Sequence, residues 1–189
     1  ILHEQSLALV RALGRTGGIA ASLNNLGLVA RSQGQYERAA TYYAESLALR
    51  REQGDEWSMA VALSNLGLVA SEQGHYQGAV ARYEESLALR QKLGDKRGIA
   101  ILLNQLGVAE YHQRNYSRAA TLHEESLTLQ AELNDKAGVA DSFYGLAKVS
   151  SAQGSQAQAY QFYTESLALR RELGDRAGIA ACLEAIAAV

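Results

Sequence analysis

The sequence predicts an all-α protein, built as a solenoid of antiparallel helix hairpins. The segment Glu165–Ala180 recurs at 45–60, 85–100 and 125–140, with a partial copy at 5–20, always in steps of 40 residues. Within each step, apolar side chains follow the three- to four-residue spacing of helices and not the alternation of strands. A fixed period of about 20–50 residues is typical of solenoids, in which each repeat buries its apolar face against its neighbours.

We expect ten helices in chain order, interrupted by short turns and by no proline. The first spans Leu2–Leu13 and ends at Gly14, where the pattern breaks. The next two, Ile19–Gln33 and Tyr36–Gln53, form a hairpin around Gly34. The same hairpin returns at 56–95, 96–135 and 136–175, and Arg176–Val189 supplies one more first helix.

These elements divide the chain into a single array covering residues 1–189. Residues 1–15 are the second helix of a truncated repeat, and residues 176–189 are the first helix of another. Four complete repeats lie between them, at 16–55, 56–95, 96–135 and 136–175. Because the pattern is cut at both ends, we expect the chain to be a piece of a longer array.

The loops between repeats carry a capping signal. Gly54 suits the left-handed conformation after a helix end, and Asp55 can accept hydrogen bonds from the free amides of the next helix. Aspartate returns at 95, 135 and 175, and Asn134 replaces the glycine while still tolerating the left-handed region.

Small residues inside the repeat predict close helix packing. We expect Gly27, Gly67 and Gly107 on the first helices to let the backbones approach. Aromatic or imidazole rings on the second helices should fill the space beside them: Tyr43, Tyr83, His123 and Tyr163. The register serines at 6, 46, 86, 126 and 166 are expected to bond back to the carbonyl four residues earlier in their own helix.

Composition favours a folded protein of the reducing cytoplasm and gives no sign of catalysis. The net charge of −2 offers no electrostatic reason to bind nucleic acid or an anionic membrane. Cys182 is the one cysteine, no long apolar run predicts a membrane span, and the four histidines have no metal-ligand spacing. We therefore expect no enzymatic activity and no cofactor.

The motif Leu23-x-x-Leu26-Gly27, followed by Gly34-x-Tyr36-x-x-Ala39-x-x-x-Tyr43, resembles the tetratricopeptide repeat. It departs from that family in having leucine for the leading tryptophan, serine for a later alanine, no closing proline, and about six residues more than the usual repeat of about 34. This long form is similar to the repeats of kinesin light chains, of Pins-type adaptors, and of arrays attached to bacterial signalling ATPases and transcription regulators. The resemblance implies a right-handed superhelix whose first helices line a concave groove for a protein or peptide.

The resemblance also implies that an asparagine just before the Leu-Gly pair holds the backbone of an extended peptide. Asn25 and Asn65 match that position, Gln105 is a near match, and Gly145 departs from it. A carboxamide suits the task because it can donate to a carbonyl and accept from an amide. The alternative is that these asparagines bond within the array and bind nothing.

Helical spacing adds further groove candidates on the same face. They are Asn24, Leu28, Arg31, Ser64, Leu68, Asn104, Val108, Tyr111, His112, Tyr144 and Lys148. Lateral packing between first helices is the alternative role for the apolar members. Trp57 either covers its loop or anchors a partner. The basic residues of a carboxylate clamp are absent, so we do not expect recognition of a chaperone Glu-Glu-Val-Asp tail.

Two functions remain open. The first is a protein- or peptide-binding scaffold or sensor, part of a larger signalling or regulatory protein. The second is a purely architectural array that self-associates through the apolar faces of its terminal helices, where Ile179, Leu183 and Ile186 would lie partly open.

Overall fold

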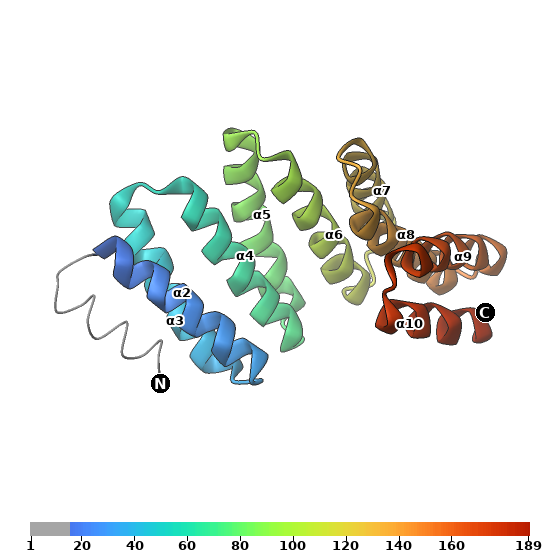
Figure 1. Cartoon of the computed structure of the whole chain (residues 1–189), viewed down its shortest axis with the longest axis horizontal. Coiled ribbons are helices and arrows are strands. Elements are labelled where there is room, and N and C mark those ends of the chain that lie inside the picture. The colour runs from blue at the N-terminus through green and yellow to red at the C-terminus, as the bar shows by residue number, and fades with distance from the viewer. Residues whose placement is uncertain (1–15) are drawn as a thin grey trace. The chain divides into compact units, whose positions relative to one another are not determined.

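The computed structural model describes residues 16–189, in which every regular element is a helix (Figure 1). The expected helix Leu2–Leu13 lies outside the described residues. The elements are α2 (Thr16–Ser32), α3 (Tyr36–Gln53), α4 (Glu56–Glu72), α5 (Tyr76–Leu93), α6 (Lys96–His112), α7 (Tyr116–Glu132), α8 (Lys136–Ala152), α9 (Gln156–Leu173) and α10 (Arg176–Ala187). We call the even-numbered helices first helices and the odd-numbered ones second helices. The predicted order of hairpins is confirmed, although α2 begins three residues earlier than Ile19.

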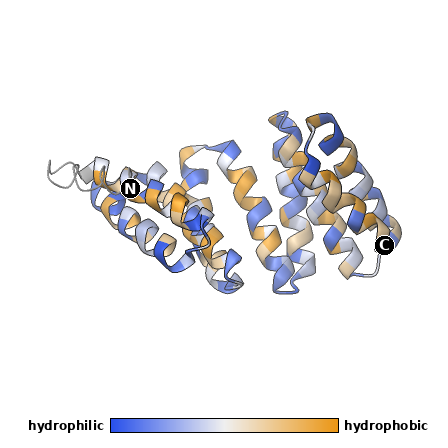
Figure 2. Ribbon diagram, turned by 60° about the horizontal axis from the view of Figure 1, so that its bottom comes forward, coloured by the Kyte–Doolittle hydropathy of each residue, from blue (hydrophilic) through white to orange (hydrophobic). Residues whose placement is uncertain are grey.

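The described residues form two compact units, of which the first ends at residue 93 and the second covers residues 94–189. In the described part of unit 1, α2 pairs with α3 and α4 pairs with α5, while α3 packs against α4. In unit 2, α6 pairs with α7 and α8 with α9, α7 packs against α8, α6 also contacts α8, and α10 packs on α9. Within each helix, apolar and polar positions alternate around the axis (Figure 2).

The loops between repeats show the predicted capping. Gly54 has φ 67° and Gly174 has φ 69°, and the amide of each bonds to carbonyls of the preceding helix. Asp55 accepts a hydrogen bond from the amide of Ser58, which opens α4. The aspartates at 95, 135 and 175 accept equivalent bonds from the amides of the glycines at 98, 138 and 178.

Two residues other than glycine also adopt the left-handed conformation. Asn134, with φ 53°, does so as predicted. Arg114, with φ 65°, stands where the other hairpins have a glycine, and the sequence analysis did not single it out. A left-handed conformation is unfavourable for a side chain of this size, so the turn between α6 and α7 carries strain that the glycine turns avoid.

The glycines of the first helices lie directly against the rings of the second helices, as predicted. A Cβ added at Gly27 would lie 2.5 Å from Cε1 of Tyr43, and one at Gly67 would lie 2.6 Å from Cδ1 of Tyr83. Both rings are fully buried, so they cannot move aside. Because the interior is close-packed, glycine is what allows each pair of helices to approach so closely.

The prediction for the register serines was wrong. Their hydroxyls do not bond within their own helix but cross the hairpin to the carbonyl of an alanine on the first helix. Ser46 donates to Ala20 at 2.8 Å and Ser86 to Ala60 at 2.7 Å. In unit 2, Ser126 donates to Ala100 at 2.9 Å and Ser166 to Ala140 at 2.8 Å. All four serines are buried, so each bond satisfies a hydroxyl that has no access to water. Ser6 lies outside the described residues.

We predict that Gly67→Ala destabilises the fold by about 1–3 kcal/mol, because the new methyl group would overlap the buried ring of Tyr83. Gly78→Ala is the matched control, since a Cβ at that helical position meets nothing within 4 Å. The control should stabilise the fold by about 0.5–1 kcal/mol, because alanine favours a helix interior over glycine. Urea denaturation followed by circular dichroism measures both. Equal midpoints for the two variants would contradict the packing argument.

Candidate functional site

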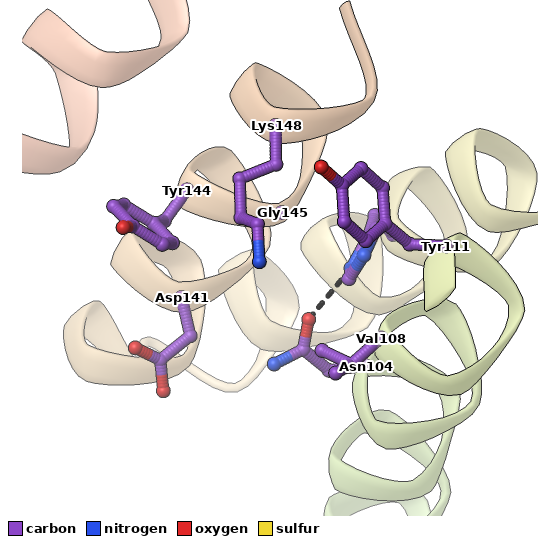
Figure 3. Close-up of a pocket in the computed structure, with 8 residues that line it drawn as sticks. Asn104, Val108, Tyr111, Asp141, Tyr144, Gly145 and Lys148 are labelled. Carbon is purple, nitrogen blue, oxygen red and sulfur yellow. Dashed lines mark hydrogen bonds between the residues drawn. The ribbon is translucent and has the colours of Figure 1, made fainter. Parts of the chain in front are cut away.

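A pocket of 230 Å³ opens on the exposed face of the first helices of unit 2. Helix α6 contributes three of its lining side chains, α7 contributes one, and α8 contributes the rest. The lining residues are Asn104, Val108, Tyr111, His123, Asp141, Tyr144, Gly145 and Lys148 (Figure 3). Tyr111 and Tyr144 stand on opposite sides of the pocket, and Lys148 extends between them (Figure 3).

Lys148 is the basic residue of this pocket. Its side chain is half-buried, and its Nζ lies 4.6 Å from the centroid of the Tyr111 ring. At that distance the ammonium interacts with the negative face of the ring. Burial lowers the pKa of Lys148 because the charged ammonium loses water. A cation–π contact replaces only part of that hydration.

His123 forms the floor of the pocket. The side chain is 1% exposed, and its Nδ1 lies 2.7 Å from Oδ1 of Asn104. Because an amide oxygen can only accept, His123 Nδ1 carries the hydrogen and donates it. Burial, and secondly the nearby positive charge of Lys148, lower the pKa of His123 to about 4. The imidazole is therefore neutral at physiological pH.

The acidic residue of the pocket is already paired. Asp141 Oδ1 lies 2.6 Å from Nη2 of Arg170, and the same guanidinium holds the capping residue Asp175 through Nη1 at 2.5 Å. The carboxylate of Asp141 points away from Lys148 (Figure 3). Asp141 is thus held by a guanidinium of α9 that it shares with Asp175. The groups of the pocket that remain for a ligand are hydrogen-bond donors.

Five predicted groove residues of unit 2 line this pocket together: Asn104, Val108, Tyr111, Tyr144 and Lys148. Two others do not line it. His112 is exposed, and its ring stands edge-on to that of Tyr111 with the centroids 5.4 Å apart. Gln105 is half-buried, and its Oε1 is buried without a hydrogen-bond partner in residues 16–189.

Three lining residues were not predicted for the groove: His123, Asp141 and Gly145. A signal was available, because each of them departs from the residues at its register position in the other repeats. His123 stands for tyrosine and Gly145 for an amide residue. Asp141 stands for an apolar residue.

Several predicted groove residues of unit 1 form hydrogen bonds or ion pairs within that unit. Asn65 donates to Oδ1 of Asn24 at 3.0 Å, and Arg31 forms an ion pair with Glu72 at 2.8 Å. Ser64 donates to the carbonyl of Ala60 and lies 2.9 Å from the hydroxyl oxygen of Ser86. Leu28 is 41% exposed and Leu68 is half-buried.

Asn25 is exposed and makes no hydrogen bond to another residue of the described chain. It lines a second pocket, of 180 Å³, formed by α2, α3 and α4. The other lining residues are Ala20, Ala21, Asn24, Ser46, Arg50, Trp57, Ser58 and Val61. Trp57 is 58% exposed at the mouth of this pocket. Its indole is thus placed beside polar groups of the predicted groove.

Residues 16–189 contain no group of three or more His, Cys, Asp or Glu side chains able to hold a metal ion. Over the same range, no helix combines the length and apolar character that a membrane crossing requires.

Comparisons with known proteins identify the repeat. A family model described as tetratricopeptide repeat matches residues 1–52, 18–92, 58–132 and 98–172. No curated protein sequence matches the chain.

Solved structures share the fold. The structure of BtubC (BKLC) from P. vanneervenii is 23% identical with a TM-score of 0.82, over 92% of this chain and 72% of that one. A putative kinesin light chain from Podosopora anserina, with nearly identical TPR-like repeats, is 19% identical with a TM-score of 0.75, over 92% and 86%. Aspartyl phosphate phosphatase F from Bacillus subtilis is 12% identical with a TM-score of 0.79, over 86% of this chain and 43% of that one.

We predict that acid destabilises unit 2 through His123. The folded-state pKa of about 4 lies below the ordinary value of 6.5, so the unfolded chain binds this proton first as the pH falls. The stability contributed by the neutral imidazole is complete above pH 6.5 and is lost between pH 6.5 and about 4. The loss should amount to roughly 3 kcal/mol.

The control for this prediction is His123→Gln, which keeps a donor toward Asn104 and cannot be protonated in this range. Urea midpoints at pH 7 and pH 4.5 should fall more for the wild-type chain than for the variant. The same fall in both proteins would show that other groups cause the acid sensitivity.

Proposed function

Because the chain belongs to the tetratricopeptide repeat family, we propose that it binds an extended segment of a partner protein on the exposed faces of its first helices. The family is generally a protein-interaction module, and we propose neither a reaction nor a cofactor for this chain. We further propose that it serves as the sensor or scaffold part of a larger signalling or regulatory protein, because its long repeats resemble arrays attached to such proteins.

The observation that carries this proposal is the pocket on α6 and α8. Residues that do not contribute to the buried core converge there: Asn104, Tyr111 and Lys148. A concave site with rings for walls and a few directed polar groups is the usual form of a ligand site. In unit 1, Asn25 and Trp57 provide a similar combination of an amide and an aromatic ring.

The asparagines of unit 1 contribute unequally to this proposal. Asn65 uses one of its amide hydrogens to bond Asn24, which supports a role within the array for that group. The side chain of Asn25 is exposed and keeps its donor and its acceptor for a ligand. A substitution of Asn25 therefore tests recognition of the partner's backbone without breaking a hydrogen bond among the described residues.

A second candidate function is self-association through α10. The face of this helix that looks away from α9 carries Leu183, 46% exposed, with Ala180 and Ala187 also exposed. Ile186, in contrast, is half-buried and packs against the buried cluster around Tyr163. Apolar side chains gathered on one face favour contact with another protein surface.

We predict that Asn25→Ala weakens the binding of partner segments by about two- to tenfold, the effect of losing one net hydrogen bond. The probes are peptides selected on the wild-type chain from a random display library, with affinities measured by fluorescence anisotropy. Gln33→Ala, an exposed amide in the turn after α2, is the control and should leave the affinity unchanged. If Asn25→Ala binds as tightly as Gln33→Ala at equal thermal stability, Asn25 is not part of the site.

We predict that Leu183→Lys abolishes any association of the chain with itself while leaving its helicity unchanged, because the side chain is exposed. Sedimentation velocity over a range of concentrations measures the association. Ile186→Glu is unsuitable for this test, since it would disturb the packing around Tyr163. A wild-type chain that remains monomeric at all concentrations would remove this candidate function.

A further inference from the structure

The departures from the repeat pattern in unit 2 gather in one pocket. At the position of Lys148 the earlier repeats have Leu28, Leu68 and Val108. At the position of Gly145 they have asparagine or glutamine, and at the position of His123 the other repeats have tyrosine. Sequences break their own local pattern chiefly where function requires it. The pocket of α6, α7 and α8 is therefore the part of unit 2 that packing alone does not explain.

Gly145 allows His123 to form the floor of the opening. A Cβ at residue 145 would lie 2.4 Å from Cε1 of His123, so no larger residue fits against the imidazole as it stands. An asparagine or glutamine, as in the earlier repeats, would displace the ring. Glycine at 145 thus lets a buried polar side chain line the opening between α6 and α8.

Two hydrogen-bond donors point into this opening. The ammonium of Lys148 is one, and no ion pair joins it to an acidic residue within positions 16–189. The second is the amide nitrogen of Asn104. His123 donates to Oδ1 of Asn104 at 2.7 Å, and this fixes the carboxamide with its NH₂ group toward the pocket (Figure 3). That NH₂ group has no hydrogen-bond partner among the described residues.

Lys148 is the charged group of the pocket that lacks a partner of opposite charge among residues 16–189. Asp141, the acidic member, is ion-paired with Arg170 at 2.6 Å and points away from Lys148. Lys148 has no such partner, and a half-buried ammonium without a counter-charge is unfavourable. A ligand that brings one negative charge and two acceptor atoms would satisfy Lys148 and Asn104 together.

We propose that this pocket binds the side-chain carboxylate of an aspartate or glutamate in the partner segment, with Lys148 and Asn104 as the two donors and His123 as the residue that positions Asn104. The proposal rests on the proposed function and names the chemistry of its ligand. The volume of 230 Å³ lies below the range of about 300–1,000 Å³ that is usual for whole small molecules, and it suits a single side chain.

A carboxylate fits better than a phosphate group. A phosphate carries about −1.5 to −2 charges at pH 7 and is usually bound by a cluster of arginines. This pocket offers one unpaired cation, and Asp141 lines the same space. A single negative charge is what Lys148 alone can neutralise.

The first test uses a random peptide library displayed against the full chain and against two variants. Lys148→Gln removes the charge from the pocket. Lys136→Gln removes the same charge from an exposed lysine of the same helix, whose partner Glu172 lies on the surface. We expect peptides selected on the wild-type chain to share an acidic residue, and to bind about tenfold more weakly to Lys148→Gln but equally to Lys136→Gln.

Selected peptides that lack a shared acidic residue, or that bind Lys148→Gln as well as the wild type, would overturn this proposal but leave peptide binding in place. If no peptide is selected at all, the proposed function fails as well. The two failures are therefore distinguishable.

A second test does not depend on the library. Acetylglutamate methylamide, acetylglutamine methylamide and inorganic phosphate are titrated separately into the ¹⁵N-labelled chain and followed by NMR. We expect the signals of Asn104 side-chain NH₂ and Gly145 to move with the glutamate probe only, and this response to disappear in Lys148→Gln. Equal shifts with the glutamine probe, no shift with any probe, or stronger shifts with phosphate would each contradict a carboxylate site.

Discussion

The hydrogen bond between a buried serine hydroxyl and an alanine carbonyl across each hairpin is the constraint on which the rest of the structure depends. It recurs in all four described hairpins, with donor–acceptor distances of 2.7–2.9 Å. A buried hydroxyl without a partner would cost about 1–3 kcal/mol, so only one alignment of the two helices is favourable. That alignment brings the ring at 43, 83 or 123 over the glycine of the facing helix. In these three hairpins the serine bond and the ring–glycine contact therefore require the same alignment of the two helices.

The candidate site is a local variation on this requirement. In the hairpin of α6 and α7 the ring is an imidazole, which fits against Gly107 and also carries a donor for Asn104. The helices keep their alignment through Ser126, and the imidazole that is introduced forms the buried floor of the pocket between α6 and α8. The repeat can thus accept a functional group at the ring position without losing the contact that orders the hairpin.

Much of the fold follows from the sequence because its causes are local or periodic. The turn at Gly54 and Asp55, the left-handed Asn134 and the contact of Gly67 with Tyr83 were all predictable from residue type and spacing. The partner of Ser86 was not, because a period of 40 residues does not tell whether a hydroxyl bonds within its helix or across the hairpin. The left-handed conformation at residue 114 lacked the signal of a glycine.

The site was predictable in part for the same reason. Helical spacing placed Asn104, Tyr111 and Lys148 on one face, and the structure brings them to one pocket. The bond of Asn65 to Asn24 joins two repeats, and no pattern within a single repeat can indicate it. Gly145 contributes by letting the ring of His123 pack against its backbone, a contact that becomes visible only when the ring is placed. The division of the pocket between repeats has a genetic consequence. Its donor Asn104 and floor His123 lie before the Asn134–Asp135 turn, and Gly145 and Lys148 lie after it. Recombination that exchanges whole repeats at such a turn would preserve every hairpin yet separate the two halves of the pocket. The site is therefore inherited only when these two repeats stay next to each other in the chain.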